Sequence, residues 1–297
     1  MTAATEYRHV KGLMRDGRRR SLFSIIAIAF LALLWSIPTL GLLVTSFRPR
    51  DDVANSGWWT LLNPFSDGNR GLTLENYRGV FEGQQMGEAF INSVAVAVPA
   101  TILPIMFAAF AAYAFTFMDF PGKDFLFIII VAVMVVPIQV AFAPMLDVLG
   151  PNGIGISQEY AAVWLLHTGF GMPLCIYTLR NYMNTLPASV VESAKIDGAT
   201  HYQTFWRLIV PMAMPAMAAF ATLQFLWVWN DLLIAQLFLS SNNQTVINRL
   251  AGLLGTQGQG QELLTAGAFI SMLLPMIVFF ALQRFFVRGL TSGAVKG

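Results

Sequence analysis

An apolar stretch in the last third of the chain carries polar and aromatic side chains at helical spacing. On a helix of about 3.6 residues per turn, Gln224, Trp227 and Asp231 fall on one side, with Asn230 beside them. Such a face suits a sugar path, because aromatic rings stack on a pyranose while amide and carboxylate groups bond its hydroxyls. A carboxylate at the centre of a membrane helix costs about 2.5–3.5 kcal/mol and must face protein or water. The alternative is therefore that Asp231 and Asn230 bond to neighbouring helices.

Two further polar side chains lie in apolar stretches. His167 would suit a proton relay, but its stretch offers no carboxylate partner, so a hydrogen-bonded structural histidine is favoured. Gln139, between Pro137 and Pro144, is either a polar cavity group or half of a helix–helix hydrogen bond. The sequence shows no nucleophile with its base, no set of metal ligands and no phosphate-binding loop. We therefore expect that the protein is not an enzyme and that it binds no metal and no cofactor.

The composition requires a membrane. Of 297 residues, 56% are hydrophobic and only 11% are charged, whereas about a quarter are charged in a soluble domain. The mean hydropathy is +0.61, so the excess apolar residues need lipid as their solvent, and a soluble enzyme is excluded. The net charge of +2 argues against a nucleic-acid partner, which would require a basic stripe.

Long windows without charges predict an all-α membrane protein with six transmembrane helices. Each window is long enough for the ~20 residues that cross the hydrocarbon, and each contains proline. Proline frees a backbone carbonyl, which favours kinked helices around a cavity, although proline is also commoner in membrane helices generally. The expected spans are Leu22–Phe47, Ala89–Phe117, Phe125–Leu146, Tyr160–Leu179, Met212–Leu239 and Leu263–Phe286.

The distribution of Lys and Arg predicts the orientation. Most of these residues lie in segments that the spans place on one side together with both termini, which are therefore expected to be cytoplasmic. The first span exceeds the ~7–15 residues of a signal-peptide core, so it is interpreted as a membrane helix. The expected organisation is a cytoplasmic N-terminal segment (1–21), a transmembrane domain (22–287) with an external loop (48–88) and a cytoplasmic loop (184–211), and a cytoplasmic tail (288–297).

The cytoplasmic loop is far longer than a turn needs and predicts two helices. Pro187 suits the first turn of one helix, which Gly198 ends. Thr200 and Gln203 form a capping-box pattern for a second helix, which is expected to stop at Pro211. Physical reasoning alone favours an amphipathic hairpin that rests on lipid.

The same loop resembles the EAA motif of ABC importer membrane subunits, in which a glutamate-alanine-alanine group precedes a glycine and a later leucine-proline pair. The sequence departs from the motif at Ser193, Leu208 and Val210, but each of these residues keeps the size or the apolar character of the residue that the motif has there. The resemblance implies that this loop is a coupling helix that docks in a cleft of an ATPase subunit. The residues it assigns to that contact are Glu192, Ser193, Ala194, Asp197, Gly198 and Pro211.

Further stretches are similar to the maltose-type carbohydrate importers, and in particular to their shorter permease subunit. They include Leu74-Glu75-Asn76-Tyr77, Ala112-Tyr113-Ala114-Phe115, Trp229-Asn230-Asp231 and the tail from Gln283 to Gly297. The resemblance implies a type I ABC importer in a bacterial cytoplasmic (inner) membrane that works by alternating access. Its partners would be a second permease subunit in a heterodimer, two copies of a cytoplasmic ATPase, an extracytoplasmic sugar-binding protein and membrane lipid.

The implied cargo is a sugar, with an oligosaccharide such as an α-glucoside favoured by the resemblance. The expected translocation path contains Gln139, Gln224, Trp227, Asn230 and Asp231, although these polar groups could instead contact the partner subunit. A polyol or glycerol-phosphate importer is the alternative, although a phosphate solute should call for basic residues in the path. An ion-coupled secondary transporter is disfavoured, because the sequence shows no internal repeat and little that could couple an ion.

Overall fold

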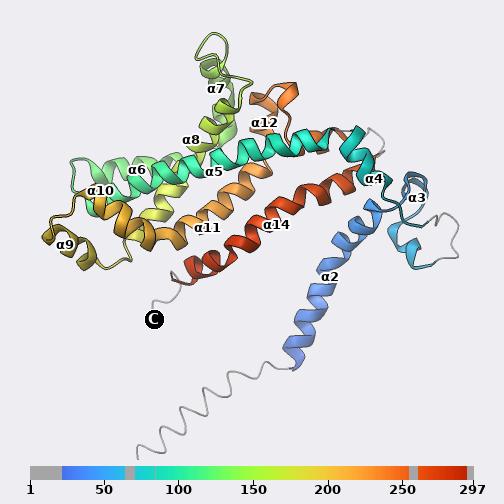
Figure 1. Cartoon of the computed structure of the whole chain (residues 1–297), viewed down its shortest axis with the longest axis horizontal. Helices are drawn as coiled ribbons and strands as arrows, with labels where there is room; N and C mark the ends of the chain where they lie inside the picture. Colours follow the sequence, from blue (N-terminus) through green and yellow to red (C-terminus); the bar gives the residue numbers. More distant parts are fainter. Residues whose placement is uncertain (1–21, 64–70, 84, 254–259, 293–297) are drawn as a thin grey trace, which may run out of the picture. The chain divides into compact units, whose positions relative to one another are not determined.

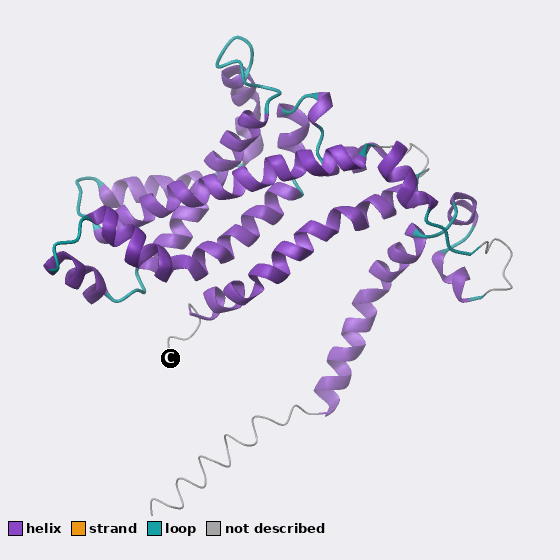
Figure 2. Cartoon of the chain, viewed as in Figure 1, coloured by secondary structure: helices purple, strands orange, loops and turns teal. Residues whose placement is uncertain are grey.

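The computed structural model describes residues 22–63, 71–83, 85–253 and 260–292, and side chains up to residue 285. Helices and loops account for this part of the chain, which holds no strand beyond an isolated bridge between Gln158 and Leu239 (Figure 2). The chain divides into two compact units, Met1–Asn76 and Tyr77–Gly297, which are described separately.

The first unit holds a long apolar helix and a short ordered segment that follows it. Arg48 organises this segment, because its Nη1 donates to the Ser56 carbonyl (3.0 Å) and its Nη2 to the Asp52 carbonyl (3.0 Å). The Asn76 side chain donates to the carbonyls of Ser46 (2.9 Å) and Arg48 (2.8 Å), which ties the end of the segment to the end of the helix. The elements are α2 (Leu22–Ser46), α3 (Arg50–Asn55) and η1 (Trp58–Leu62), while α4 (Glu75–Arg78) crosses the boundary between the units.

The second unit is a helix bundle in which α5, α8, α11 and α14 run side by side (Figure 1). Small residues let these helices approach closely: Ala108, Ala112 and Ala216 are all buried. Its elements are η2 (Gly79–Gly83), α5 (Met86–Phe117), α6 (Lys123–Val133), η3 (Ile138–Ala141), α7 (Phe142–Leu149), α8 (Tyr160–Met183), α9 (Ala188–Ile196), α10 (His201–Thr204), η4 (Phe205–Ile209), α11 (Val210–Trp229), α12 (Leu233–Phe238), η5 (Ser241–Asn243), α13 (Val246–Leu253) and α14 (Gln261–Ser292).

In the described residues, five helices are long and apolar enough to cross a membrane. The third expected span differs, because Lys123–Val133 and Ile138–Leu149 meet at a bend of 95°. Pro137 explains the break, since it has no N–H and disfavours the helical conformation at Val136. The last turn before it is tightened by a hydrogen bond from the Val136 N–H to the Val133 carbonyl (3.1 Å). The expected six spans are therefore five continuous helices and one broken pair.

The expected fifth span, Met212–Leu239, is wrong at its C-terminal end. The helix stops at Trp229, and α12 begins only at Leu233. Asp231 lies in the break, where its Oδ2 accepts hydrogen bonds from the N–H groups of Ile234 (2.9 Å) and Ala235 (3.3 Å). Aspartate bonds nearby backbone donors outside a helix, so this residue starts a new helix rather than continuing the old one.

Candidate functional site

The 184–211 loop folds into two helices joined by a tight glycine turn. The Gly198 N–H donates to the Lys195 carbonyl (3.1 Å), and the Ala199 N–H donates to the Ala194 carbonyl (2.9 Å). This bond pair is a Schellman motif, which places the glycine in the left-handed region. Gly198 has φ +74°, a conformation that favours glycine, and the helix ends just before it, as expected.

The first helix of the loop, α9, has a buried face and an exposed face. Val191 and Ala194 are buried, and Val191 packs in the core of the bundle. Glu192 is exposed, and Ile196 is 86% exposed although it is apolar. Pro187 precedes the helix as its cap residue and does not form part of its first turn. The loop therefore presents charged side chains, Glu192 among them, and the large apolar side chain of Ile196 to its surroundings.

The second helix begins with the expected capping box. The Thr200 hydroxyl accepts from the Gln203 N–H (3.3 Å), and the Gln203 side-chain oxygen accepts from the Thr200 N–H (2.9 Å). Each bond satisfies a backbone donor that the first turn of a helix leaves without a partner. The sequence pattern is thus confirmed at the level of individual hydrogen bonds.

The expectation that this helix stops at Pro211 is wrong. Helical structure runs without a break from His201 to Trp229, so the loop and the fifth span form one element. A π-helical turn over Phe205–Ile209 precedes the proline, and the Val210 N–H bonds back to the Phe205 carbonyl. Such a turn is wider than an α-helical one, which relieves the clash between a proline ring and the preceding turn.

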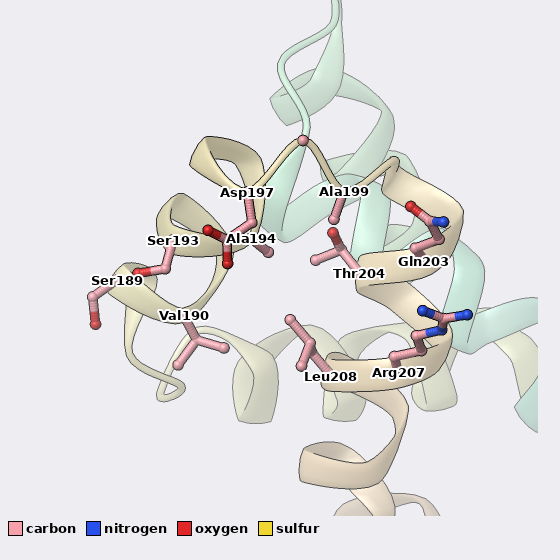
Figure 3. Close-up of a pocket in the computed structure, with 11 residues that line it drawn as sticks. Ser189, Val190, Ser193, Ala194, Asp197, Ala199, Gln203, Thr204, Arg207 and Leu208 are labelled. Carbon is pink, nitrogen blue, oxygen red and sulfur yellow. The ribbon is translucent and has the colours of Figure 1, made fainter.

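A cleft of about 730 Å³ lies between the two helices of the loop. Figure 3 shows Val190, Ser193 and Asp197 facing Thr204 and Leu208 across it. Of the residues assigned to the ATPase contact, Ser193, Ala194, Asp197 and Gly198 line the cleft. Glu192 lies on the exposed surface of α9, and Pro211 lies in the helix beyond the cleft.

Aromatic side chains fix the second helix to the bundle. The Phe205 ring stacks on Phe110 with centroids 4.5 Å apart and meets Tyr113 edge-on at 5.4 Å. The Tyr113 hydroxyl also lies 3.0 Å from Nδ1 of His201, the first residue of α10. Sequence reasoning missed this contact, because the partners are far apart in the chain and neither residue carries a local signal.

A second cavity, of about 390 Å³, lies where the third span breaks. Residues of the break line it together with Gly169, Gly171, Gln224 and Trp227. The buried Gln224 side chain donates from Nε2 to the carbonyls of Ala100 (3.2 Å) and His167 (3.4 Å). The structure thus brings two of the expected path residues, one amide and one aromatic, to the wall of a cavity.

The other expected path residues are not among those that line this cavity. Asp231 caps α12, and its Oδ2 lies 3.8 Å from Nε2 of the buried His167. The His167 ring meets Trp227 edge-on at 5.1 Å. Asn230 is exposed and donates to the carbonyl of Leu226 (2.7 Å) in its own helix, and Gln139 is exposed on η3. Asp231 therefore has partners within this chain.

Residues 89–292 match the family described as binding-protein-dependent transport system inner membrane component. The chain belongs to this family. It is therefore a permease subunit of an ABC transporter, a multi-pass inner-membrane protein and not an enzyme, as the EAA resemblance implies.

Curated relatives and solved structures agree with this family assignment. The permease is 49% identical over 274 residues to the osmoprotective compounds uptake permease protein GgtD of Synechocystis sp., with 91% of each chain covered. It is 37% identical to the alpha-glucoside transport system permease protein AglG of Rhizobium meliloti, with 92% of this chain and 96% of that one covered. A chain from a bacterial ABC transporter that imports alginate shares the fold, with a TM-score of 0.72, 18% identity and coverage of 89% of this chain and 95% of that one.

Proposed function

We propose that this permease imports a neutral sugar, specifically an oligosaccharide such as an α-glucoside, and that its 184–211 loop transmits the motion of an ATPase to the translocation path. The helix His201–Trp229 carries this proposal. Arg207, near one end, lines the loop cleft, and Trp227, near the other, lines the cavity at the broken span. They are separated by about 30 Å of helix, so a displacement of the loop moves the cavity wall directly.

The cavity lining favours a neutral solute over a phosphorylated one. None of the described residues that line it is basic, whereas phosphate is recognised in proteins mainly by Arg, Lys and backbone N–H groups. Trp227 and Phe170 supply aromatic surface, and Gln224 supplies an amide. These groups match the apolar faces and hydroxyls of a sugar.

The names of the relatives support the same class of cargo. GgtD is a permease for osmoprotective compounds, and AglG is a permease for alpha-glucosides. A trehalose permease of Mycobacterium tuberculosis, SugB, is 35% identical over 232 residues. Small neutral carbohydrates are therefore the first solutes to test.

The proposed assembly contains a second permease subunit, two ATPase copies and an external solute-binding protein. In this arrangement both termini and the 184–211 loop are cytoplasmic, and the ATPase occupies the surface formed by Glu192, Ile196 and the cleft. ATPase closure would move the loop, and the attached α11 would re-orient the cavity between the two sides of the membrane.

Reconstitution in lipid vesicles tests this proposal. The complete assembly is supplied with its binding protein and, in separate reactions, an α-glucoside, a polyol and glycerol phosphate, and both ATP hydrolysis and solute uptake are measured. We expect the α-glucoside to stimulate both activities and glycerol phosphate to stimulate neither. Uptake of glycerol phosphate without uptake of the α-glucoside would overturn the assignment of a neutral sugar.

A further inference from the structure

A tyrosine on α5 holds the second helix of the 184–211 loop. Tyr113 is only 4% exposed, four residues before the end of α5, and its hydroxyl lies 3.0 Å from Nδ1 of His201. Its ring also meets the rings of His201, edge-on at 6.0 Å, and Phe205. One side chain thus contacts two residues in the first turns of the helix that leads to the cavity.

The opposite end of α5 is fixed by other hydrogen bonds. Asn92 donates from Nδ2 to the Gln244 carbonyl (3.1 Å) and accepts the Tyr160 hydroxyl at Oδ1 (2.8 Å). Ser93 accepts the Val246 N–H at its Oγ (2.9 Å). From this end to Tyr113 the helix covers about 30 Å. Helix α5 is therefore held at one end by these hydrogen bonds and contacts the loop through Tyr113 at the other, so it can transmit a displacement of the loop along the bundle.

We propose that Tyr113 is a positioning residue for coupling, which keeps His201 in register with α5 so that the loop and the bundle move together. This inference rests on the proposed function of the loop. Without the hydroxyl, the turn at His201 can yield to the ATPase while Phe205 stays packed on α5, so hydrolysis proceeds with less movement of the cavity wall. The predicted defect is one of coupling, and not of assembly.

The aromatic packing allows these two effects to be separated. Phe205 is 3% exposed and stacks on Phe110, so the second helix stays attached to the bundle when one hydroxyl is removed. Tyr113→Phe keeps the ring and deletes only the hydrogen bond. Tyr177→Phe is the matched control, because Tyr177 lies on α8, stacks on Phe127 at 6.3 Å and shows no hydroxyl hydrogen bond in the described part of the chain.

The experiment measures solute transported per ATP hydrolysed in vesicles that hold the complete assembly. For Tyr113→Phe we expect ATPase co-purification equal to wild type and a fall of about threefold in transport per ATP, as for the loss of one ordinary hydrogen bond. Tyr177→Phe should match wild type. His201→Ala should show the same defect as Tyr113→Phe, and the double variant should be no worse than His201→Ala, because both changes remove one shared bond.

Two results would overturn this inference and leave the proposed function standing. One is a Tyr113→Phe assembly whose transport per ATP equals that of wild type, and the other is a loss fully explained by weaker ATPase co-purification. A wild-type assembly without solute-stimulated hydrolysis would instead overturn the proposed function, and this inference with it.

Discussion

Replacement of Gly198 by alanine is a direct test of the loop, because its cost comes from the backbone alone. Gly198 has φ +74°, and no atom lies within 4 Å of the position that a Cβ would occupy. A non-glycine residue in this region costs roughly 1–2 kcal/mol. At about 1.4 kcal/mol for each factor of ten, the fraction of loops with the native turn falls by at most about 5- to 30-fold.

Gly122 offers a matched control elsewhere in the chain. It has φ +79° at the start of α6 and equally open space around its Cβ position, so Gly122→Ala carries the same backbone strain outside the loop. Gly198→Asn is the conservative variant, since asparagine tolerates the left-handed region better than alanine does.

The assay is the affinity of the assembled permease pair for the ATPase, followed by solute-stimulated hydrolysis. Gly198→Ala is expected to weaken the affinity for the ATPase by at most about 5- to 30-fold, because only loops with the native turn bind. Gly198→Asn should recover part of the affinity, and Gly122→Ala should leave it unchanged. Equal losses for the two alanine variants, or no loss for Gly198→Ala, would refute the reasoning and favour a hairpin that rests on lipid.

The remaining predictions concern charge, cavity shape, capping and ATP. Glu192→Lys reverses an exposed charge at the proposed contact and should weaken ATPase co-purification while membrane insertion stays normal; unchanged co-purification would exclude this residue. Gly171→Ala places a Cβ 2.7 Å from Nε2 of the hydrogen-bonded Gln224 and should reduce transport, whereas Gly169→Ala meets no atom within 4 Å and should not. Asp231→Ala removes a cap worth about 1 kcal/mol and should lower thermal stability, which Asp231→Asn should partly restore if capping is the main role. The isolated chain should hydrolyse no ATP above a mock preparation, because its sequence has no phosphate-binding loop.

Local patterns could be predicted from the sequence because the residues that decide them are close together. Thr200 and Gln203 lie three positions apart and form the expected capping box, and the first helix ends just before Gly198, as expected. The apolar windows likewise predicted the continuous spans, because whether a segment is long and apolar enough to cross lipid can be judged from that segment alone.

The features that sequence reasoning missed depend on context. Every expected span contains proline, so nothing local distinguishes Pro137, where a span breaks, from Pro215, which lies inside the continuous helix α11. The partners of Tyr113 and Gln224 lie far along the chain, and their contacts follow only from helix packing. Asp231 fits both a polar helix face and a helix cap, and the path role predicted for it and for Gln139 and Asn230 stays a prediction.

The broken third span has a consequence for how this part of the chain crosses the membrane. By its length, Lys123–Val133 covers about 16 Å, close to half of the ~30 Å hydrocarbon layer, so it cannot cross the layer alone. Its later neighbour α8 supplies contacts, with the Arg180 guanidinium 3.8 Å from the centroid of the Phe127 ring. The third crossing therefore depends on both halves of the broken pair, which are long and apolar enough only together, and on their packing against the bundle.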